Sequence, residues 1–118
     1  VGAYDVRYQT YADFSGRGDQ KFCVNKPDLV ASGVGILAAA PGGGESVRSG
    51  TSMATPFVTG SSALLMEWGI VRGNDLYLYG ERIKAYLRRG ARKINGFNNY
   101  PNNEIGYGRL CVAESLMI

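Results

Sequence analysis

The sequence predicts an α/β fold, in which helices pack against a small β-sheet. Short apolar segments at residues 1–4, 29–31 and 35–39 have the length and composition of strands. Two longer segments, at 51–68 and 76–89, have the length and apolar spacing of helices. Because strand and helix segments alternate along the chain, we expect them to form an α/β layer.

The N-terminal part of the chain is expected to contain the first two strands. A short buried strand at 1–4 begins the chain, and a mostly irregular segment at 5–27 follows it. Phe14 and Phe22 are the apolar side chains that we expect to anchor this segment. The next strand is predicted at 29–31.

Residues 35–48 are expected to form a hairpin. Two strand-like segments, 35–39 and 45–48, flank the turn-forming sequence Pro41-Gly42-Gly43-Gly44. The second of these strands leads directly into the helix predicted at about 51–68. Apolar residues occupy most faces of this helix, so we expect it to be buried on most sides.

A second helix is predicted at 76–89, with Asn74 and Asp75 as candidate N-terminal caps and Gly90 as its C-terminal stop. Its expected apolar face consists of Tyr79, Ile83, Tyr86 and Leu87. The chain then forms a turn-rich loop before a short final helix at about 112–117.

The segment Gly50–Gly60, which reads Gly-Thr-Ser-Met-Ala-Thr-Pro-Phe-Val-Thr-Gly, places one serine at the start of the first predicted helix. Gly50 permits a tight turn, and Thr51 and Ser52 are residue types that cap helix N-termini. Pro56 is tolerated if it lies in the first turn. Ser52 then lies at the positive end of the helix dipole, beside unpaired N–H groups that can stabilise an oxyanion. The local pattern alone also fits a capped structural helix without catalytic function.

The sequence contains no histidine. A serine nucleophile of this kind needs a neighbouring general base, which is most often histidine. We therefore expect that this chain does not perform serine-based catalysis by itself.

The segment Gly50–Gly60 resembles the nucleophile segment of the subtilisin-like serine proteases, the subtilases, at every position but Phe57, where histidine is usual. The segments 26–33 and 106–113 are similar to further subtilase segments, in the same order along the chain. The resemblance implies a partial subtilisin-like three-layer fold, with a parallel sheet flanked by helices. It also implies that residues 1–118 are the C-terminal portion of a subtilase catalytic domain.

What the resemblance implies about activity centres on Ser52. Ser52 would be the nucleophile of a serine endopeptidase that hydrolyses peptide bonds through an acyl-enzyme. The catalytic aspartate and histidine and the oxyanion asparagine would come from outside this chain, which is expected to be inactive alone. Its expected partners are a peptide or protein substrate and the remainder of the catalytic domain. The sheet would be left with an unpaired edge and an uncovered face, so we expect the isolated chain to dimerise, swap segments or aggregate.

Two alternative functions remain open at this point. The first is a non-catalytic subtilase-like scaffold or regulatory protein, which the sequence of the intact protein would distinguish. The second is a small esterase or lipase, which uses the pattern Gly-x-Ser-x-Gly. Gly50 and Ser52 fit that pattern, but Ala54 replaces its second glycine.

The composition excludes several other classes of function. The net charge is +3, and the basic residues between 82 and 93 are interpreted as a solvated helix face and helix C-terminus. We therefore expect no nucleic-acid binding. No run of 18 apolar residues is present, so we expect no membrane span. The resemblance points to an extracellular or cell-envelope location, although the chain carries no targeting signal of its own.

The sequence predicts no cofactor for this chain. It contains no histidine and no Cys-x-x-Cys pair, which are the usual elements of a transition-metal site. The resemblance implies calcium in some members of the family, and Asp28 matches a position near a weak cation site. Cys23 and Cys111 are too few for a disulfide framework, and the sequence leaves open whether they pair.

Overall fold

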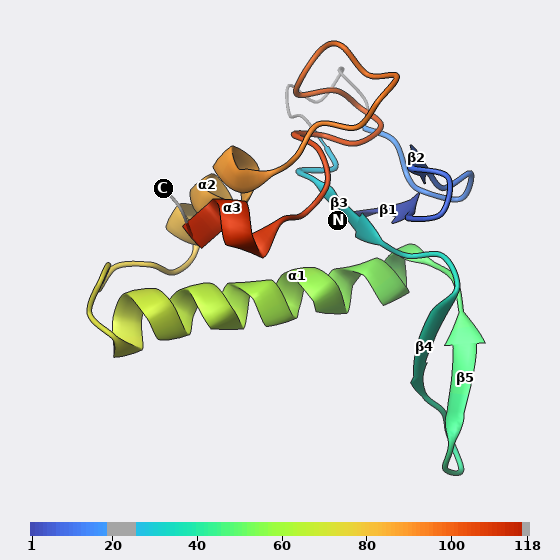
Figure 1. Cartoon of the computed structure of the whole chain (residues 1–118), viewed down its shortest axis with the longest axis horizontal. Coiled ribbons are helices and arrows are strands. Elements are labelled where there is room, and N and C mark those ends of the chain that lie inside the picture. Colours follow the sequence, from blue (N-terminus) through green and yellow to red (C-terminus); the bar gives the residue numbers. More distant parts are fainter. Residues whose placement is uncertain (19–25, 117–118) are drawn as a thin grey trace.

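The computed structural model of the chain describes residues 1–18 and 26–116, and it is built around a three-stranded sheet (Figure 1). The strands β1 (Gly2–Asp5), β2 (Thr10–Tyr11) and β3 (Val30–Ser32) lie in the order β2-β1-β3. β1 and β3 are parallel, whereas β2 is antiparallel to β1. The predicted α/β class is confirmed, but the sheet is mixed rather than purely parallel. β2 follows β1 after a short turn, and a return of this length can only pair antiparallel.

One edge of this sheet, the far side of β3, is paired with another segment of the chain at a single residue. On the β2 side of β1, which is the central strand, the carbonyl of Ala3 accepts a hydrogen bond from the N–H of Ala12 at 2.9 Å. The N–H of Ala3 donates to Oγ of Ser15 at 3.0 Å. On the far side of β3, both backbone groups of Val30 bond to residues in 108–110, at 2.9 and 2.8 Å. The segment 108–110 therefore covers Val30 of β3, whereas β2, at the other edge, has no further strand beside it among the described residues.

Both faces of the small sheet are also covered, so the expected uncovered face is wrong. One face packs against the long helix through small side chains, namely Ala3, Ala12, Ala31 and Ala54. The other face packs under the loop that precedes the final helix, through Tyr4, Val30, Ile94 and Ile105. Because the first face is made of alanines, the helix approaches the sheet closely.

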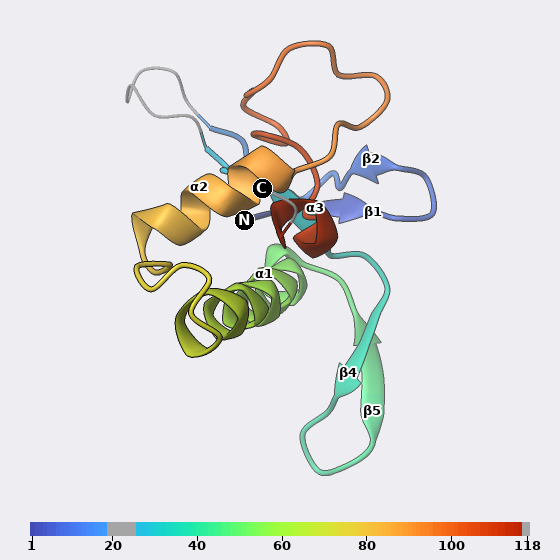
Figure 2. The same cartoon turned by 60° about the vertical axis from the view of Figure 1, so that its left-hand side comes forward.

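The predicted hairpin is confirmed, with β4 (Ile36–Ala39) antiparallel to β5 (Glu45–Arg48). Leu37 lies opposite Val47 in the register of this pair. The hairpin projects away from the sheet and the helices in both views (Figures 1 and 2). It ends directly before the long helix, so it forms one side of the region where that helix begins.

The helix α1 (Thr51–Met66) confirms the prediction at about 51–68, and a π-helical segment, Glu67–Val71, extends it. The prediction that it is buried on most sides is wrong. Its buried residues are Ala54, Ser61 and Leu65, which lie on one stripe of the helix. Figures 1 and 2 show the reason: α2 and α3 lie on one side of α1, and the opposite side carries no element.

The helix α2 (Glu81–Gly90) begins five residues later than the predicted start at Leu76. Gly80 adopts φ +58° and ψ −127°, which is incompatible with a helix and separates residues 76–79 from it. Asp75 does not cap the helix. Its Oδ1 instead accepts a hydrogen bond from the N–H of Tyr77 at 3.2 Å, which forms a local turn.

Asp75 has a second role, which is to fix the loop before α2 to the helix. Its Oδ2 accepts hydrogen bonds from Nε of Arg82 at 2.6 Å and from the hydroxyl of Tyr86 at 2.8 Å. These bonds hold the pKa of Asp75 below its usual value. Tyr79, predicted to lie on the apolar face, is exposed because it precedes the helix, whereas Leu78 is fully buried.

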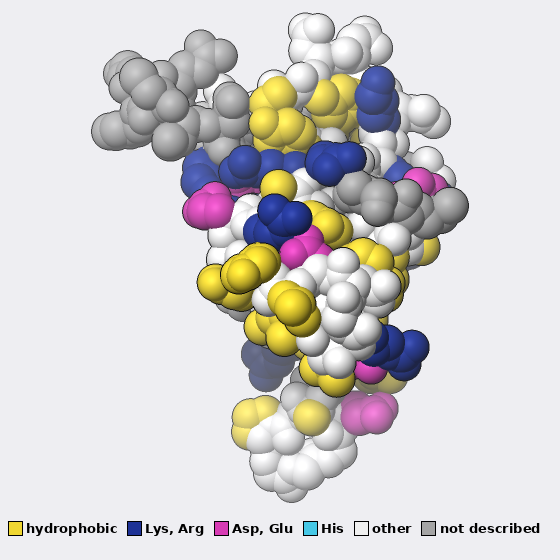
Figure 3. Space-filling view, turned by 90° about the vertical axis from the view of Figure 1, so that its left-hand side faces the viewer, with side chains coloured by type: hydrophobic (Ala, Val, Ile, Leu, Met, Phe, Trp, Pro, Cys, Tyr) yellow, Lys and Arg dark blue, Asp and Glu magenta, His cyan; other side chains and the backbone are white. Residues whose placement is uncertain are grey.

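The third part of the core joins α1, α2 and the final helix α3 (Val112–Leu116). It consists of Leu29, Leu65, Leu78 and Leu87, with Trp68 and other side chains packed around it. A Cβ added at Gly90 would lie 2.3 Å from Oγ of Ser115, so only glycine permits this close approach of α2 and α3. Figure 3 views the end of the molecule where α1 leads into the loop before α2, and hydrophobic side chains gather at the surface there.

Of the two predicted anchors of the N-terminal loop, Phe14 is wrong and Phe22 is not tested. Phe14 is 51% exposed, because Ala12 and Ser15 make the contacts with β1 instead. Phe22 and Cys23 lie outside the described residues, so a pairing of Cys23 with Cys111 is not tested. Among the described residues, no helix is both long enough and apolar enough to cross a membrane.

Candidate functional site

Ser52 is the second residue of α1, at the end of the helix that meets the sheet. The N–H of Gly50 donates to the carbonyl of Gly33 at 2.8 Å, and the N–H of Gly33 donates to the carbonyl of Tyr4 at 3.1 Å. A Cβ at Gly33 would lie 2.5 Å from Cβ of Ala3, so glycine is required at this contact. These bonds fix the start of α1 at the carboxyl end of β3, where α/β proteins commonly place their ligand sites.

The N-terminus of α1 leaves the amide of Ser52 free. The carbonyl of Gly50 accepts hydrogen bonds from the N–H groups of Met53 and Ala54, at 3.0 and 3.3 Å. Within the described residues, the N–H of Ser52 has no acceptor, and its side chain is exposed. The prediction that Thr51 or Ser52 caps the helix is wrong, because Gly50 occupies the cap position and no side chain bonds there. The hydroxyl and the amide of Ser52 are therefore both available to a bound molecule.

Pro56 is the sixth residue of α1, so the expectation that it lies in the first turn is also wrong. A proline at this position has no N–H to donate to the carbonyl of Ser52, four residues earlier. The carbonyl of Ser52, the candidate nucleophile, therefore lacks its usual hydrogen bond within the helix. The exposed ring of Pro56 forms part of the surface beside Ser52.

Two hollows meet at Ser52. One, of about 290 Å³, lies between the hairpin and α1 and is lined mainly by apolar side chains. Its lining residues besides Ser52 are Ile36, Ala38, Met53, Pro56 and Phe57. The other is an open surface along α1, beside Thr55, Thr59 and Gly60. This position lets Ser52 contact a molecule that lies across the start of the helix.

Ile36 and Ala38 of this hollow were not among the predicted site residues. They are two positions apart on β4, so they lie on the same face of the hairpin. They could have been found from the sequence, because the hairpin was predicted to lead directly into the helix that contains Ser52. Phe57, at the position where subtilases usually have histidine, contributes its ring to the same hollow.

Asp28, which matches a position near a weak cation site of some subtilases, is held by two cationic side chains. Its Oδ2 accepts a hydrogen bond from Nζ of Lys26 at 2.7 Å, and its Oδ1 pairs with Arg88. Partial burial of Asp28 opposes ionisation, but the hydrogen bonds and charges of these two side chains outweigh it and lower the pKa of the carboxyl. Arg88 in turn lies over the ring of Tyr107, at 5.3 Å. The Asp28 carboxylate does not fit a calcium site, because both of its oxygens already bind cations.

The sequence matches the Subtilase family over residues 1–108. It is 37% identical to pyrolysin of Pyrococcus furiosus over 110 residues, which cover 88% of this chain and 8% of pyrolysin. It is 33% identical to the PII-type proteinase of Lactococcus lactis subsp. cremoris over 103 residues, which cover 86% of this chain and 5% of that proteinase. The chain thus spans a small part of these relatives' lengths.

Solved structures show the same relationship. The structure of the Clostridium perfringens CspB protease aligns with a TM-score of 0.89 and 45% identity, over 98% of this chain and 25% of that chain. The structure of the patellamide maturation protease PatA aligns with a TM-score of 0.76 and 31% identity, over 98% of this chain and 40% of that chain. The fold is the α/β fold of the subtilisin-like proteases. The chain belongs to the subtilase family.

Proposed function

We propose that this chain is the C-terminal portion of the catalytic domain of a subtilisin-like serine endopeptidase, and that Ser52 is its nucleophile. The observation that carries the proposal is the free hydroxyl and free amide of Ser52 at a helix N-terminus. The membership of the subtilase family supports the reaction class, and the similar proteins named above are proteases.

The proposed reaction is peptide-bond hydrolysis through an acyl-enzyme. The Oγ of Ser52 attacks the carbonyl carbon of the peptide, while a general base accepts the hydroxyl proton and later returns it to the leaving amine. Since this sequence has no histidine, another part of the intact protein supplies the base, the aspartate that orients it and the oxyanion asparagine. The N–H of Ser52 donates to the oxyanion, and one such donor contributes roughly 3 kcal/mol to lowering the barrier.

The test uses the protein that contains this chain and a fluorophosphonate, which labels an activated serine. We expect stoichiometric labelling at Ser52, and we expect Ser52→Ala to abolish it and to lower kcat by about 10⁶. Ser62→Ala is the matched control, because Ser62 lies on the same helix and its hydroxyl donates to the carbonyl of Val58 at 2.8 Å. Retention of protease activity in Ser52→Ala would show that the nucleophile is elsewhere.

The same probe separates the proposal from the alternative of a non-catalytic subtilase-like scaffold. An intact protein that folds but does not label at Ser52 would support the scaffold. For the isolated 118-residue chain, we expect labelling no faster than that of an ordinary serine. Rapid labelling of the isolated chain would reveal a general base within it that is not histidine.

We also propose that the exposed side of α1 is where the remainder of the catalytic domain packs. Phe57 and Leu64, seven residues apart on that side, are 45% and 56% exposed. This apolar surface is a second reason, beside the sheet edge at β2, to expect self-association of the isolated chain. Size-exclusion chromatography with light scattering tests this, and a monomer at high concentration would contradict it.

A further inference from the structure

A second cavity, of about 260 Å³, lies at the end of β1, apart from Ser52. Its walls include Tyr4, Val6, Gln9, Ile94, Asn95 and Arg109. Tyr4 and Ile94 belong to the core cluster on the sheet face opposite α1. None of its lining residues lines the hollows beside Ser52, so the two sites are distinct.

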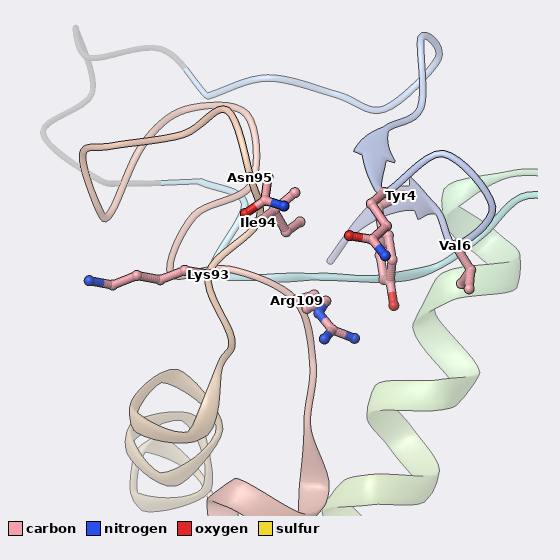
Figure 4. Close-up of a pocket in the computed structure, with 7 residues that line it drawn as sticks. Tyr4, Val6, Lys93, Ile94, Asn95 and Arg109 are labelled. Carbon is pink, nitrogen blue, oxygen red and sulfur yellow. The ribbon is translucent and has the colours of Figure 1, made fainter.

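The polar groups of this cavity are suited to a negatively charged ligand. Figure 4 shows the guanidinium of Arg109 and the phenol of Tyr4 projecting into the same space. The side-chain amides of Gln9 and Asn95 add neutral hydrogen-bond donors, and none of the lining residues is acidic. Lys93 also borders the cavity, but its ammonium extends away in Figure 4 and lies 5.7 Å from the ring centre of Tyr100.

Arg109 is a partly buried cation without an anionic partner among the described residues. Its backbone is held rigidly, since Arg109 and Arg92 exchange two hydrogen bonds of 2.8 and 2.9 Å. The side chain of Arg92 pairs with Glu114 at 2.9 Å, so the charge of that neighbour is compensated. A partly desolvated guanidinium favours an anion that accepts two parallel hydrogen bonds, which is the geometry of carboxylate and phosphate groups.

The wall of the cavity also includes Gln9, from the turn between β1 and β2. Gln9 has φ +51°, in the left-handed region that residues other than glycine seldom adopt. Gln9 belongs to the tight turn that joins β1 to β2, and a positive φ is common in such hairpin turns. The turn therefore holds the backbone of Gln9 at the wall of the cavity.

We propose that this cavity binds a small oxyanion, a carboxylate or phosphate group, with Arg109 as the principal ligand. Tyr4, Gln9 and Asn95 supply further donors to the same oxygens. The volume corresponds to roughly nine water molecules at about 30 Å³ each, which accommodates phosphate or a short dicarboxylate. This site is independent of the proposed chemistry at Ser52.

The test is isothermal titration of the purified intact protein with sodium phosphate and, separately, with sodium succinate, at constant ionic strength. We expect one site per chain, and we expect Arg109→Gln to weaken binding about tenfold or more, as for loss of hydrogen bonds to a charged group. Arg89→Gln is the matched control, because Arg89 is exposed and the change in net charge is the same. We expect binding to the Arg89→Gln variant to stay within about twofold of the wild type, as for a surface change away from the site.

Two further variants keep the test decisive if Arg109→Gln does not fold. Arg109→Lys keeps the charge but loses the planar pair of donors, and Asn95→Ala removes an exposed donor from the wall. Both are expected to weaken binding while circular dichroism shows a folded protein. Binding of phosphate without succinate, or the reverse, identifies the group that the cavity takes. Binding of neither anion, or equal loss in the Arg89→Gln control, would overturn the proposal.

Discussion

Two adjacent leucines on α1 allow a direct test of how this helix packs. Leu65 is fully buried in the cluster with Leu78 and Leu87, whereas Leu64 is 56% exposed. Leu→Ala removes the equivalent of three methylene groups, about 2.4 kcal/mol at about 0.8 kcal/mol each, and a residual cavity adds to this at a buried site. We therefore expect Leu65→Ala to lower the free energy of unfolding by about 3 kcal/mol. For Leu64→Ala, less than half of the side chain is covered, and we expect about 1 kcal/mol.

The assay is urea unfolding of the 118-residue chain, at a concentration where light scattering shows a monomer, followed by the fluorescence of Trp68. Trp68 is the only tryptophan, and it packs against the cluster that contains Leu65, so its emission reports directly on this contact. Both variants replace leucine by alanine in the same helix, so the change in helix propensity is the same in the two. Equal destabilisation by the two substitutions, or a larger effect of Leu64→Ala, would refute the proposed one-sided packing of α1.

Three further substitutions test other contacts by the same unfolding measurement. Asp28→Asn removes the ion pair with Arg88. The pKa of Asp28 is lowered in the folded chain. The stabilisation by this pair is therefore present above the ordinary carboxyl pKa of about 3.9 and is lost as the pH falls below it. The stability difference between wild type and Asp28→Asn should therefore be constant near neutrality and shrink below about pH 4, and a pH-independent difference would contradict this assignment. Gly33→Ala places a Cβ 2.5 Å from that of Ala3, and we expect a loss of about 1–3 kcal/mol, whereas an unchanged midpoint would show that the contact relaxes easily. A Cβ added at Gly60, in the interior of α1, would have no atom within 4 Å. We expect Gly60→Ala to raise the free energy of unfolding by about 0.5–1 kcal/mol, and a decrease would reveal a neighbour on that face.

The elements that were predicted correctly depend on short stretches of sequence. The hairpin follows from two strand-like segments around Pro41-Gly42-Gly43-Gly44, and its observed strands are Ile36–Ala39 and Glu45–Arg48. The start of α1 follows from the segment after Gly50. In each case the residues that determine the structure are neighbours along the chain, so the pattern alone is sufficient.

The errors arose where a distant contact or a single backbone conformation decides the outcome. The apolar pattern of 76–89 is continuous, but the positive φ of Gly80 divides it, and Asp75 bonds to Arg82 instead of capping a helix. The apolar residues of α1 indicated burial without indicating which side has a packing partner. The pairing of Val30 with residues 108–110 was not expected, because a contact between segments so far apart along the chain has no sequence pattern of its own.

Part of the candidate site follows from the sequence of one segment, and the rest depends on other segments of the chain. Ser52 and its free amide are both fixed by the start of α1, which the bond between Gly50 and Gly33 holds against the sheet. The apolar hollow beside Ser52 needs Ile36 and Ala38 as well, and the adjoining hairpin brings them there. The histidine base of the proposed reaction has no counterpart in this sequence, which lacks histidine. The reaction therefore requires another segment that docks accurately at the N-terminus of α1, because the base must lie within hydrogen-bond distance of the Ser52 hydroxyl.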